Sequence, residues 1–465
     1  MYSNLTSLMK RCAILLAAVV TISSFKHGSG FFANNFSYAV SPAGDVNGDG
    51  YSDVILSIFK LEYGVSKEGR VFLYYGTGNG LSANPVWSSA NKQDNSNFGE
   101  GVANAGDING DGFADVIIGA SHYSNGEENE GAAFVYFGSP SGLEKEPSWV
   151  MEGNQANAFY GTSVSTAGDV NKDGFADVVV GAHFYDNGET NEGKVYVYLG
   201  SANGLSKTTF WTSEGNQVGA NFGKSVASAG DVNKDGYFDI IVGAPNYDNG
   251  QSNEGRAFIF LGSPTGLTQS AGWHGEVNQA DANYGNAVAC AGDVNGDGFS
   301  DIIVGANRYD EGQSNVGKVF LYLGSAGGVS MFPDWSYAGN VMDGNLGLSV
   351  ASAGDINGDG FGEFIVGSFL YNIEQPQGKA YVYSGSAKGV TNKIVQIDMQ
   401  NNEAVTVGQA VSSAGDINGD GYADVIAGVI WNSDNSGVPG KAMLVKGSSN
   451  GLQLNANKDV AMLSK

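Results

Sequence analysis

The chain has 465 residues, of which 71 are glycine and 42% are apolar, and its formal net charge is −25. The apolar share is high enough to build a core and argues against intrinsic disorder, and abundant glycine with many aromatic residues favours short strands and tight turns over long helices. The negative charge argues against nucleic acid and anionic membranes as partners, and it suits a protein that holds divalent cations.

The N-terminus has the pattern of a secretory signal. Two basic residues, Lys10 and Arg11, precede an apolar run over 12–22 that ends in two serines. We expect residues 1–24 to be the signal and residues 25–465 to form one domain that is secreted, either extracellular or periplasmic. The apolar run is short for a membrane span, and no other segment reaches about 18 apolar residues, so no transmembrane segment is expected.

One acidic motif recurs along the rest of the chain. It reads G-D-[VI]-N-x-D-G-[FY]-x-[DE], and the separations between successive copies are 62, 62, 62, 62, 62 and 61 residues. Such regular self-similarity is the signature of a repeat architecture. The first Asp of the motif stands at Asp45, Asp107, Asp169, Asp231, Asp293, Asp355 and Asp416.

Each repeat predicts four strands. In the second repeat these cover 98–106, 116–120, 132–137 and a last strand around Trp149. Four strands in each of seven repeats predict an all-β, seven-bladed β-propeller. A solenoid is the rival architecture, but it would need atypical capping repeats at its ends. Small residues of the first strand suit the crowded axis, and aromatic residues suit the wider gaps between blades.

The motif itself predicts a calcium loop. In Asp107–Asp115, oxygen donors stand at positions 1, 3, 5 and 9, a backbone carbonyl is available at position 7, and Gly112 permits a sharp reversal. Oxygen donors without His or Cys favour calcium over zinc or copper. An EF-hand is excluded because position 12 is apolar in every repeat. The alternative is that Asp and Asn only form turns, which seven matching copies make improbable.

We therefore expect up to seven Ca²⁺ ions, with positions 1, 3, 5, 7 and 9 of each loop as ligands. The sixth loop ends in Glu instead of Asp, which adds a methylene and is expected to loosen that site. The candidate ligands are Asp45, Asn47, Asp49, Tyr51, Asp53, Asp107, Asn109, Asp111, Phe113, Asp115, Asp169, Asn171, Asp173, Phe175, Asp177, Asp231, Asn233, Asp235, Tyr237, Asp239, Asp293, Asn295, Asp297, Phe299, Asp301, Asp355, Asn357, Asp359, Phe361, Glu363, Asp416, Asn418, Asp420, Tyr422 and Asp424.

The repeats resemble FG-GAP repeats, the unit of the integrin α-subunit propeller. Phe98-Gly99, Tyr160-Gly161 and Phe222-Gly223 match the first half of that name, and Gly243-Ala244-Pro245 matches the second. The resemblance runs from about Phe36 to the C-terminus. It implies a ring with calcium on one face and ligand-binding loops on the other. Integrin propellers carry calcium loops in only some blades, whereas all seven look competent here, and nothing like the integrin leg domains follows.

Aromatic residues recur in the loops expected on the face opposite calcium. Beside Asp and Asn they are candidates to stack on a ligand such as a sugar, but the alternative, that they pack between blades above simple turns, is favoured. These candidates are Tyr123, Tyr185, Tyr247, Tyr309, Tyr371 and Trp431. His122 and His183 are interpreted as equivalent residues of neighbouring repeats with a structural role.

The function predicted from these features is that of a noncatalytic, calcium-binding adhesion or binding module, not an enzyme. Its partner is expected to be a protein or glycan on the face opposite the calcium loops, and the chain is expected to be a monomer. The alternatives are a calcium-dependent lectin and, less favoured, a secreted enzyme acting on polysaccharide or phospholipid. No catalytic motif and no appended catalytic domain supports the enzyme.

Overall fold

The computed structural model divides the chain into two units, Met1–Asn35 and Phe36–Lys465. It describes residues 39–58, 69–370, 377–391, 394–398, 405–431, 441–453 and 460–462. The first unit, and with it the predicted signal over 1–24, lies outside the described residues. In the part that is described, no helix is long and apolar enough to cross a bilayer.

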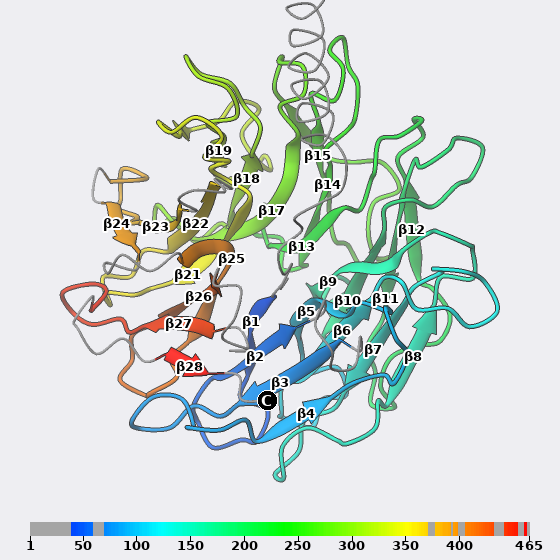
Figure 1. The fold of residues 1–465 in the computed structure, drawn as a ribbon, viewed down its shortest axis with the longest axis vertical. Coiled ribbons are helices and arrows are strands. Elements are labelled where there is room, and N and C mark those ends of the chain that lie inside the picture. Colours follow the sequence, from blue (N-terminus) through cyan, green and yellow to red (C-terminus); the bar gives the residue numbers. More distant parts are fainter. Residues whose placement is uncertain are drawn as a thin grey trace, which may run out of the picture. The chain divides into compact units, whose positions relative to one another are not determined.

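The second unit is a ring of seven blades, each an antiparallel sheet of four consecutive strands (Figure 1). Blade 1 consists of β1 (Val40–Gly44), β2 (Asp53–Ile58), β3 (Arg70–Tyr74) and β4 (Trp87–Ser89); blade 2 of β5 (Phe98–Gly106), β6 (Asp115–Ala120), β7 (Ala132–Tyr136) and β8 (Trp149–Glu152); blade 3 of β9 (Tyr160–Gly168), β10 (Asp177–Ala182), β11 (Lys194–Tyr198) and β12 (Trp211–Glu214); and blade 4 of β13 (Ser225–Gly230), β14 (Asp239–Ala244), β15 (Arg256–Phe260) and β16 (Trp273–Glu276). Blade 5 consists of β17 (Tyr284–Gly292), β18 (Asp301–Ala306), β19 (Lys318–Tyr322) and β20 (Trp335–Ala338); blade 6 of β21 (Ser349–Gly354), β22 (Glu363–Leu370), β23 (Gln377–Tyr383) and β24 (Ile394–Ile397); and blade 7 of β25 (Val405–Gly415), β26 (Asp424–Trp431), β27 (Lys441–Val445) and β28 (Val460–Met462). This architecture confirms the predicted seven-bladed propeller.

The burial of each strand follows from its place in the blade. The second strands of blades 1 to 5, such as β6 with the sequence DVIIGA, are buried at every residue because neighbouring blades cover both of their faces. The first strands are rich in Gly, Ala and Ser, and they pack against one another around the axis. Their small side chains allow seven strands to crowd together there. The core is accordingly divided into clusters that each join two adjacent blades.

The ring is closed by backbone hydrogen bonds between neighbouring loops. In each blade, the residue before the second strand donates its N–H to the carbonyl of the first motif Asp in the preceding blade. Ser52 N donates to Asp416 O at 3.0 Å, which joins blade 1 to blade 7 in the same way. Each of these two blades keeps its own four strands. The ring therefore closes without exchange of a strand.

A tryptophan at the start of the fourth strand links most blades to the next one. The Trp149 ring packs edge-on against Tyr198 of blade 3, with centroids 5.0 Å apart, and its Nε1 donates to Ser206 O at 3.1 Å. The same pair of contacts recurs at Trp87, Trp211 and Trp273. The expectation that aromatic residues fill the gaps between blades is confirmed.

Replacing one of these tryptophans should destabilise the ring strongly. For Trp149→Ala, which empties a buried site of 3% exposure, we expect a loss of about 3–5 kcal/mol in the free energy of unfolding. Trp149→Phe keeps most of the packing but loses the Nε1 hydrogen bond, and should cost about 1 kcal/mol. Urea unfolding measures both values. Phe332→Ala, at a side chain that is 82% exposed, is the control and should change little; an equal effect of Trp149→Ala and Phe332→Ala would contradict the role given to Trp149.

Candidate metal centre

The seven acidic loops each join the first and second strands of a blade, and they are numbered here as loops 1 to 7 after their blades. Within loop 1, Asp45 Oδ1 accepts the N–H groups of Gly48 at 2.7 Å and Asp49 at 3.1 Å, and Asp45 Oδ2 accepts that of Gly50 at 2.9 Å. Asn47 Oδ1 accepts the Asp49 N–H at 3.0 Å. The side chains at positions 1, 3 and 5 are thus drawn to the inside of one turn.

Glycine at position 6 makes this turn possible. Gly50 has a φ of +88°, and its counterparts in the other loops also have positive φ. This left-handed region disfavours residues with a Cβ atom. The sequence-based expectation of a sharp reversal at position 6 is confirmed.

The acidic residue at position 9 opens the second strand and is completely buried. Asp53 Oδ2 accepts the N–H of Val46 in the loop, and Oδ1 accepts that of Gly76 at the end of β3, both at 3.0 Å. The same two bonds recur at Asp115, Asp177, Asp239, Asp301 and Asp424. Position 9 therefore holds the acidic loop and the turn after the third strand together, a role that sequence reasoning did not anticipate.

Burial and like charge both act on this carboxyl. The pKa of Asp53 is raised from 3.8 to about 7, chiefly by burial, with the charges of Asp49 and Asp45 adding to the rise and its two backbone hydrogen bonds opposing it. The pKa of Asp424 is raised to about 6 and that of Glu363 to about 7 by the same causes. None of the salt bridges among the described residues involves a loop carboxylate.

The donor set of each loop fits a hard cation. All the side-chain donors are oxygens. In loop 1, Asp45 Oδ1 already accepts two N–H groups, but Asp45 Oδ2 accepts one and keeps a second lone pair. Within the described residues, no three or more His, Cys, Asp or Glu side chains form a ready-made metal cluster. The carboxylates of a loop instead face backbone amides, so that a cation would be held by Asp and Asn oxygens and the position 7 carbonyl together.

Loop 6 differs from the others through its longer acidic side chain. Glu363 Oε2 accepts the N–H of Ile356 at 2.9 Å, as an Asp does elsewhere, but its Oε1 accepts the side-chain amide of Asn357 at 3.2 Å. In the six other loops that amide donates to the position 5 carboxylate instead. The extra methylene thus changes the hydrogen bonding of position 3, a candidate ligand.

Neighbouring loops also touch through positions 4 and 7. A Cβ atom on Gly48 would lie 2.7 Å from the Phe113 ring, and one on Gly419 would lie 2.8 Å from Tyr51, across the closure of the ring. Position 4 is glycine in five loops and lysine in two, Lys172 and Lys234. Every position 7 ring therefore rests on the loop before it.

The two lysines place positive charge beside the following loop. Lys172 Nζ lies 5.4 Å from the centroid of the Tyr237 ring, and Lys234 Nζ lies 5.3 Å from that of Phe299. Lys234 Nζ also donates to the backbone oxygen of Asp297, position 5 of loop 5, at 3.4 Å. The sequence motif treats position 4 as variable, so this contact between loops could not be found from the motif alone.

The tyrosines predicted on the opposite side are half-buried. Tyr123, Tyr185, Tyr247 and Tyr309 each pack edge-on against an aromatic ring of the third strand of their own blade. Lys194 Nζ, the Arg256 guanidinium and Lys318 Nζ lie 4.6, 4.4 and 4.8 Å from the centroids of the last three rings. This packing agrees with the structural interpretation, and contact with a ligand stays a prediction. Tyr371 and the side chain of Trp431 lie outside the described residues.

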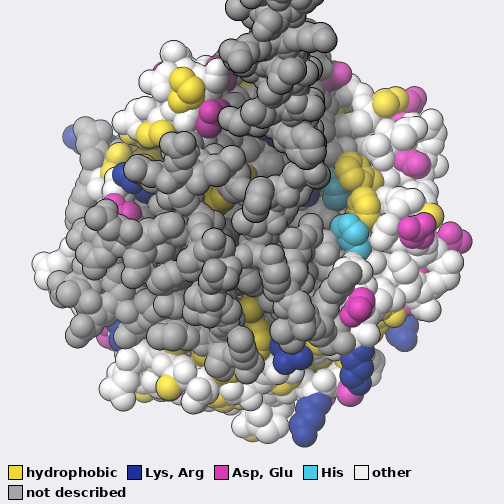
Figure 2. All heavy atoms as spheres, viewed as in Figure 1, with side chains coloured by type: hydrophobic (Ala, Val, Ile, Leu, Met, Phe, Trp, Pro, Cys, Tyr) yellow, Lys and Arg dark blue, Asp and Glu magenta, His cyan; other side chains and the backbone are white. Residues whose placement is uncertain are grey.

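The two histidines are not equivalent, contrary to the sequence interpretation. His122 comes two residues after Ala120, whereas His183 directly follows the corresponding Ala182. Both rings flank Phe159, at centroid distances of 4.6 and 5.9 Å. Burial lowers the pKa of His183 to about 2, so this ring stays neutral. Figure 2 shows histidine side chains beside hydrophobic ones on the face in view.

Comparison with known proteins agrees with the resemblance to FG-GAP repeats that the sequence motifs indicate. The FG-GAP repeat family matches residues 160–198, 222–260 and 285–322, and the FG-GAP-like repeat family matches residues 45–118.

Among curated relatives, integrin alpha-5 of Xenopus laevis is 31% identical over 231 residues, which is 48% of this chain and 21% of the relative. Integrin alpha-V of Gallus gallus is 32% identical over 222 residues, or 46% and 20% of the two chains. Integrin alpha-3 of Mus musculus is 36% identical over 153 residues, or 32% and 14%. The similarity thus covers about a fifth or less of the length of these relatives.

The buried position 9 carboxyls predict a specific pH dependence. In EDTA, we expect the melting temperature to fall as the pH rises from 5 to 8. The pKa of these groups is raised to about 7 in the folded protein, as at Asp115 and Asp177, so the folded state binds more protons than the unfolded chain below that pH. The resulting stability is lost as the pH rises through about 7. Differential scanning calorimetry checks this, and a melting temperature in EDTA that rises over the same interval would contradict it. Excess calcium is the control and should remove the fall by favouring the ionised form.

Proposed function

We propose that this chain, an integrin α-like β-propeller built from FG-GAP repeats, is a calcium-binding module that works outside the cytoplasm by binding other molecules. The propeller is the part whose similarity the comparisons establish. That the chain binds calcium, is exported and binds a partner is what we propose.

The observation that carries the calcium proposal is the repetition of one acidic loop around the whole ring. Each loop gathers two Asp and one Asn onto one turn and sets a buried acid behind them, as Asp45, Asn47, Asp49 and Asp53 do in loop 1. No salt bridge within the described residues offsets this charge. A divalent cation would neutralise it and connect the two ends of each loop.

The proposed binding role rests on the division of the ring into two faces. The first-to-second and third-to-fourth connections of every blade lie on one side, where backbone bonds such as Ala114 N to Asp45 O link them rigidly. The remaining connections lie on the other side. The similarity to integrin α subunits supports a noncatalytic binding role for such a surface, and we propose a protein as the partner. If calcium makes the face with the acidic loops rigid, that face would hold the loops on the other side of the ring in fixed positions.

Calcium should stabilise the protein strongly. At about ten times the dissociation constant, each occupied site adds about 1.4 kcal/mol to the free energy of unfolding. We expect the melting temperature to rise clearly between EDTA and millimolar calcium, and mass spectrometry of the native protein to find close to one ion per loop. Asp111→Asn keeps an oxygen acceptor for the Phe113 N–H and should reduce the metal content by one ion. A wild-type protein that melts at one temperature in both buffers would refute the calcium proposal.

The two position 4 lysines should weaken the loops that they contact. Lys172→Gly and Lys234→Gly restore the residue of the other loops at a left-handed backbone position and remove a positive charge beside loops 4 and 5. We expect about two- to tenfold tighter calcium binding at one site in each variant, measured by calorimetric titration at low salt.

Lys92→Gly is the matched control for these lysines. Lys92 also has a positive φ, of 59°, but it lies in the connection between β4 and β5 on the other side of the ring. This variant should leave every calcium affinity unchanged. Equal effects of Lys92→Gly and Lys234→Gly would show that net charge, and not the contact between loops, is responsible.

A further inference from the structure

Asn-Gly pairs recur along the whole chain and carry a chemistry of their own. Asn is a thermolabile residue, because the backbone nitrogen of the following residue can attack its side-chain carbonyl carbon. Glycine, which has no Cβ atom, hinders that attack least. The dipeptide is the same in every pair, so differences in reactivity must come from the fold. The pairs begin at Asn47, Asn79, Asn109, Asn125, Asn187, Asn203, Asn249, Asn295, Asn357, Asn418 and Asn450.

Five of these pairs occupy positions 3 and 4 of acidic loops, where the glycine N–H is hydrogen-bonded. In each of them this N–H donates to the carboxylate at position 1, at 2.6 or 2.7 Å. The Asn side chain is held as well, as at Asn47, where Oδ1 accepts the Asp49 N–H and Nδ2 donates to the Asp49 carboxylate. Attack by the glycine nitrogen would therefore require the loop to open first.

Three further pairs lie in the turns after a third strand, and their glycines are also fixed. Gly80, Gly204 and Gly451 each donate their N–H to the carbonyl three residues earlier, at 2.7, 2.7 and 2.6 Å. All three glycines are buried. These turns thus protect the nitrogen in a second way.

The remaining three pairs are not protected. They begin at Asn125, Asn187 and Asn249, in the connections between the second and third strands of blades 2, 3 and 4, and both residues of each pair are exposed. Within the described part of the chain, no hydrogen bond holds the N–H of their glycines. A Cβ atom built on any of these glycines would meet no atom within 4 Å. The attacking nitrogen is therefore free and has room to move.

The Asn side chains of these three pairs tie their connections to the fourth strand. Asn125 Nδ2 donates to the carboxylate of Glu152 at 2.9 Å. The other two Asn side chains donate likewise to Glu214 and Glu276, at 2.8 and 2.7 Å. A carboxylate in place of the amide would lose this hydrogen bond and repel the Glu.

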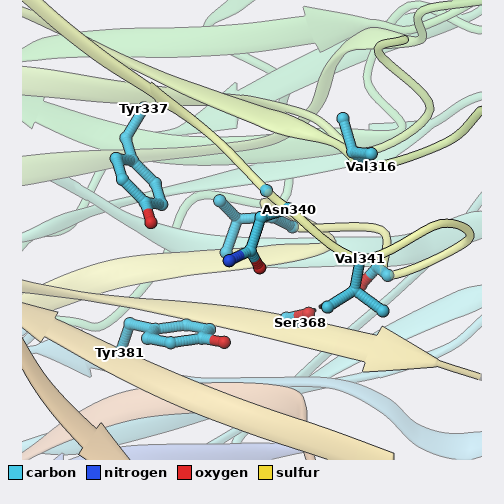
Figure 3. A pocket seen from close by; sticks show the side chains of 9 residues that line it. Val316, Tyr337, Asn340, Val341, Ser368 and Tyr381 are labelled. Atoms are coloured by element: carbon cyan, nitrogen blue, oxygen red, sulfur yellow. Dashed lines mark hydrogen bonds between the residues drawn. The ribbon is translucent and has the colours of Figure 1, made fainter. Parts of the chain in front are cut away.

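Blade 5 shows how the repeat accommodates a carboxylate at this place. Glu311 stands there instead of Asn, and its Oε2 accepts from Lys318 Nζ at 2.8 Å. Ala338 replaces the Glu of the fourth strand, and Val316 replaces the buried Glu that in blade 2 accepts the Asn125 N–H at 2.6 Å. Val316 instead lines a small cavity at the boundary with blade 6 (Figure 3). Both neighbouring glutamates are thus absent where the connection itself is acidic.

We infer that Asn125, Asn187 and Asn249 are sites of spontaneous deamidation in the folded protein, and that the reaction releases their connections from the fourth strand. The glycine nitrogen bonds to the Asn Cγ, ammonia leaves, and one water molecule opens the resulting succinimide ring. Opening at one carbonyl gives Asp, and opening at the other gives isoaspartate. One water is consumed, one ammonia is released, and no oxidant is needed. Neither calcium nor a partner takes part, so the inference does not rest on the proposed function.

The three connections should respond differently because their basic neighbours differ. Lys194 Nζ lies 2.8 Å from the Glu214 carboxylate in blade 3, and Arg256 pairs with Glu276 in blade 4. In these blades the cation can turn to the new carboxylate, as Lys318 does in blade 5. Ala132 stands at the equivalent position of blade 2, so deamidation should loosen that connection most.

Peptide mapping by mass spectrometry tests the reaction on the full chain, kept in millimolar calcium at pH 8.5 and 37 °C for several weeks. We expect the pairs at Asn125, Asn187 and Asn249 to deamidate about fivefold or more faster than the eight others, which must first break a hydrogen bond. The chain unfolded in guanidinium chloride is the control, and there all the pairs should react at similar rates. Equal rates in the folded protein, or a faster reaction at a pair in an acidic loop, would overturn the inference.

Hydrogen exchange of variants that mimic the product tests the release. In Asn125→Asp, we expect the backbone amides of residues 121–131 to exchange about fivefold faster, whereas in Asn187→Asp those of residues 183–193 should change less. Asn203→Asp, at an exposed residue in the turn between β11 and β12, adds the same charge elsewhere and should leave both segments unchanged. Equal effects of Asn125→Asp and Asn203→Asp on residues 121–131 would refute the role given to the bond with Glu152.

Discussion

The architecture depends on a buried carboxylate that opens the second strand of every blade. At Asp53, one oxygen holds the acidic loop and the other holds the end of the third strand. A carboxylate removed from water costs free energy unless it is well hydrogen-bonded, and here two backbone amides offset part of that cost. Each blade thus has its acidic loop and its outer turn fixed to one rigid point, and the loops can then be joined from blade to blade.

The link between blades is made by backbone groups, so it is independent of the side chains that vary. The carbonyl at position 1 of one loop accepts the amide before the second strand of the next, and the carbonyl at position 2 accepts an amide beyond the third strand, as in Ser139 N to Val46 O. Both bonds recur around the whole ring, across the meeting of blades 7 and 1 as well. The backbone links between the loops are therefore the same around the whole ring, and differences on this face, such as Lys172, Lys234 and Glu363, are confined to side chains.

Much of this could be predicted from the sequence because the repeat is regular. The period of 62 residues, the apolar second strand and the motif glycines determine the blade count, the strands and the loop conformation. The double role of Asp53 and the reach of Lys234 into the next loop could not be predicted, since each depends on contacts between segments whose distance in space the motif does not encode. The offset of His122 and His183, by contrast, could be read from the sequence, because the two residues are 61 positions apart in a repeat of 62.

The boundary between blades 5 and 6 illustrates the same limit, since Val316, Val341 and Leu346 stand there in place of the Glu, Gln and aromatic residue of the preceding repeats. Val316, Val341 and Leu346 are unremarkable as single residues, and they acquire meaning only when the fold places them at one boundary. Regularity elsewhere in the ring supplies the reference against which such departures become visible. In a repeat protein, each blade serves as an internal control for the others.

The tryptophan contacts also give the ring a direction. Each of these indole side chains, such as that of Trp149, extends from its own blade and packs into the core of the blade that follows in the chain. In a polypeptide that emerges from the ribosome N-terminus first, every blade would present an unfinished edge until its successor had been synthesised. Assembly would proceed blade by blade, with each new blade covering the open edge of the one before it. The last hydrogen bond between blades, from Ser52 N to Asp416 O, could form only when the seventh loop had been translated.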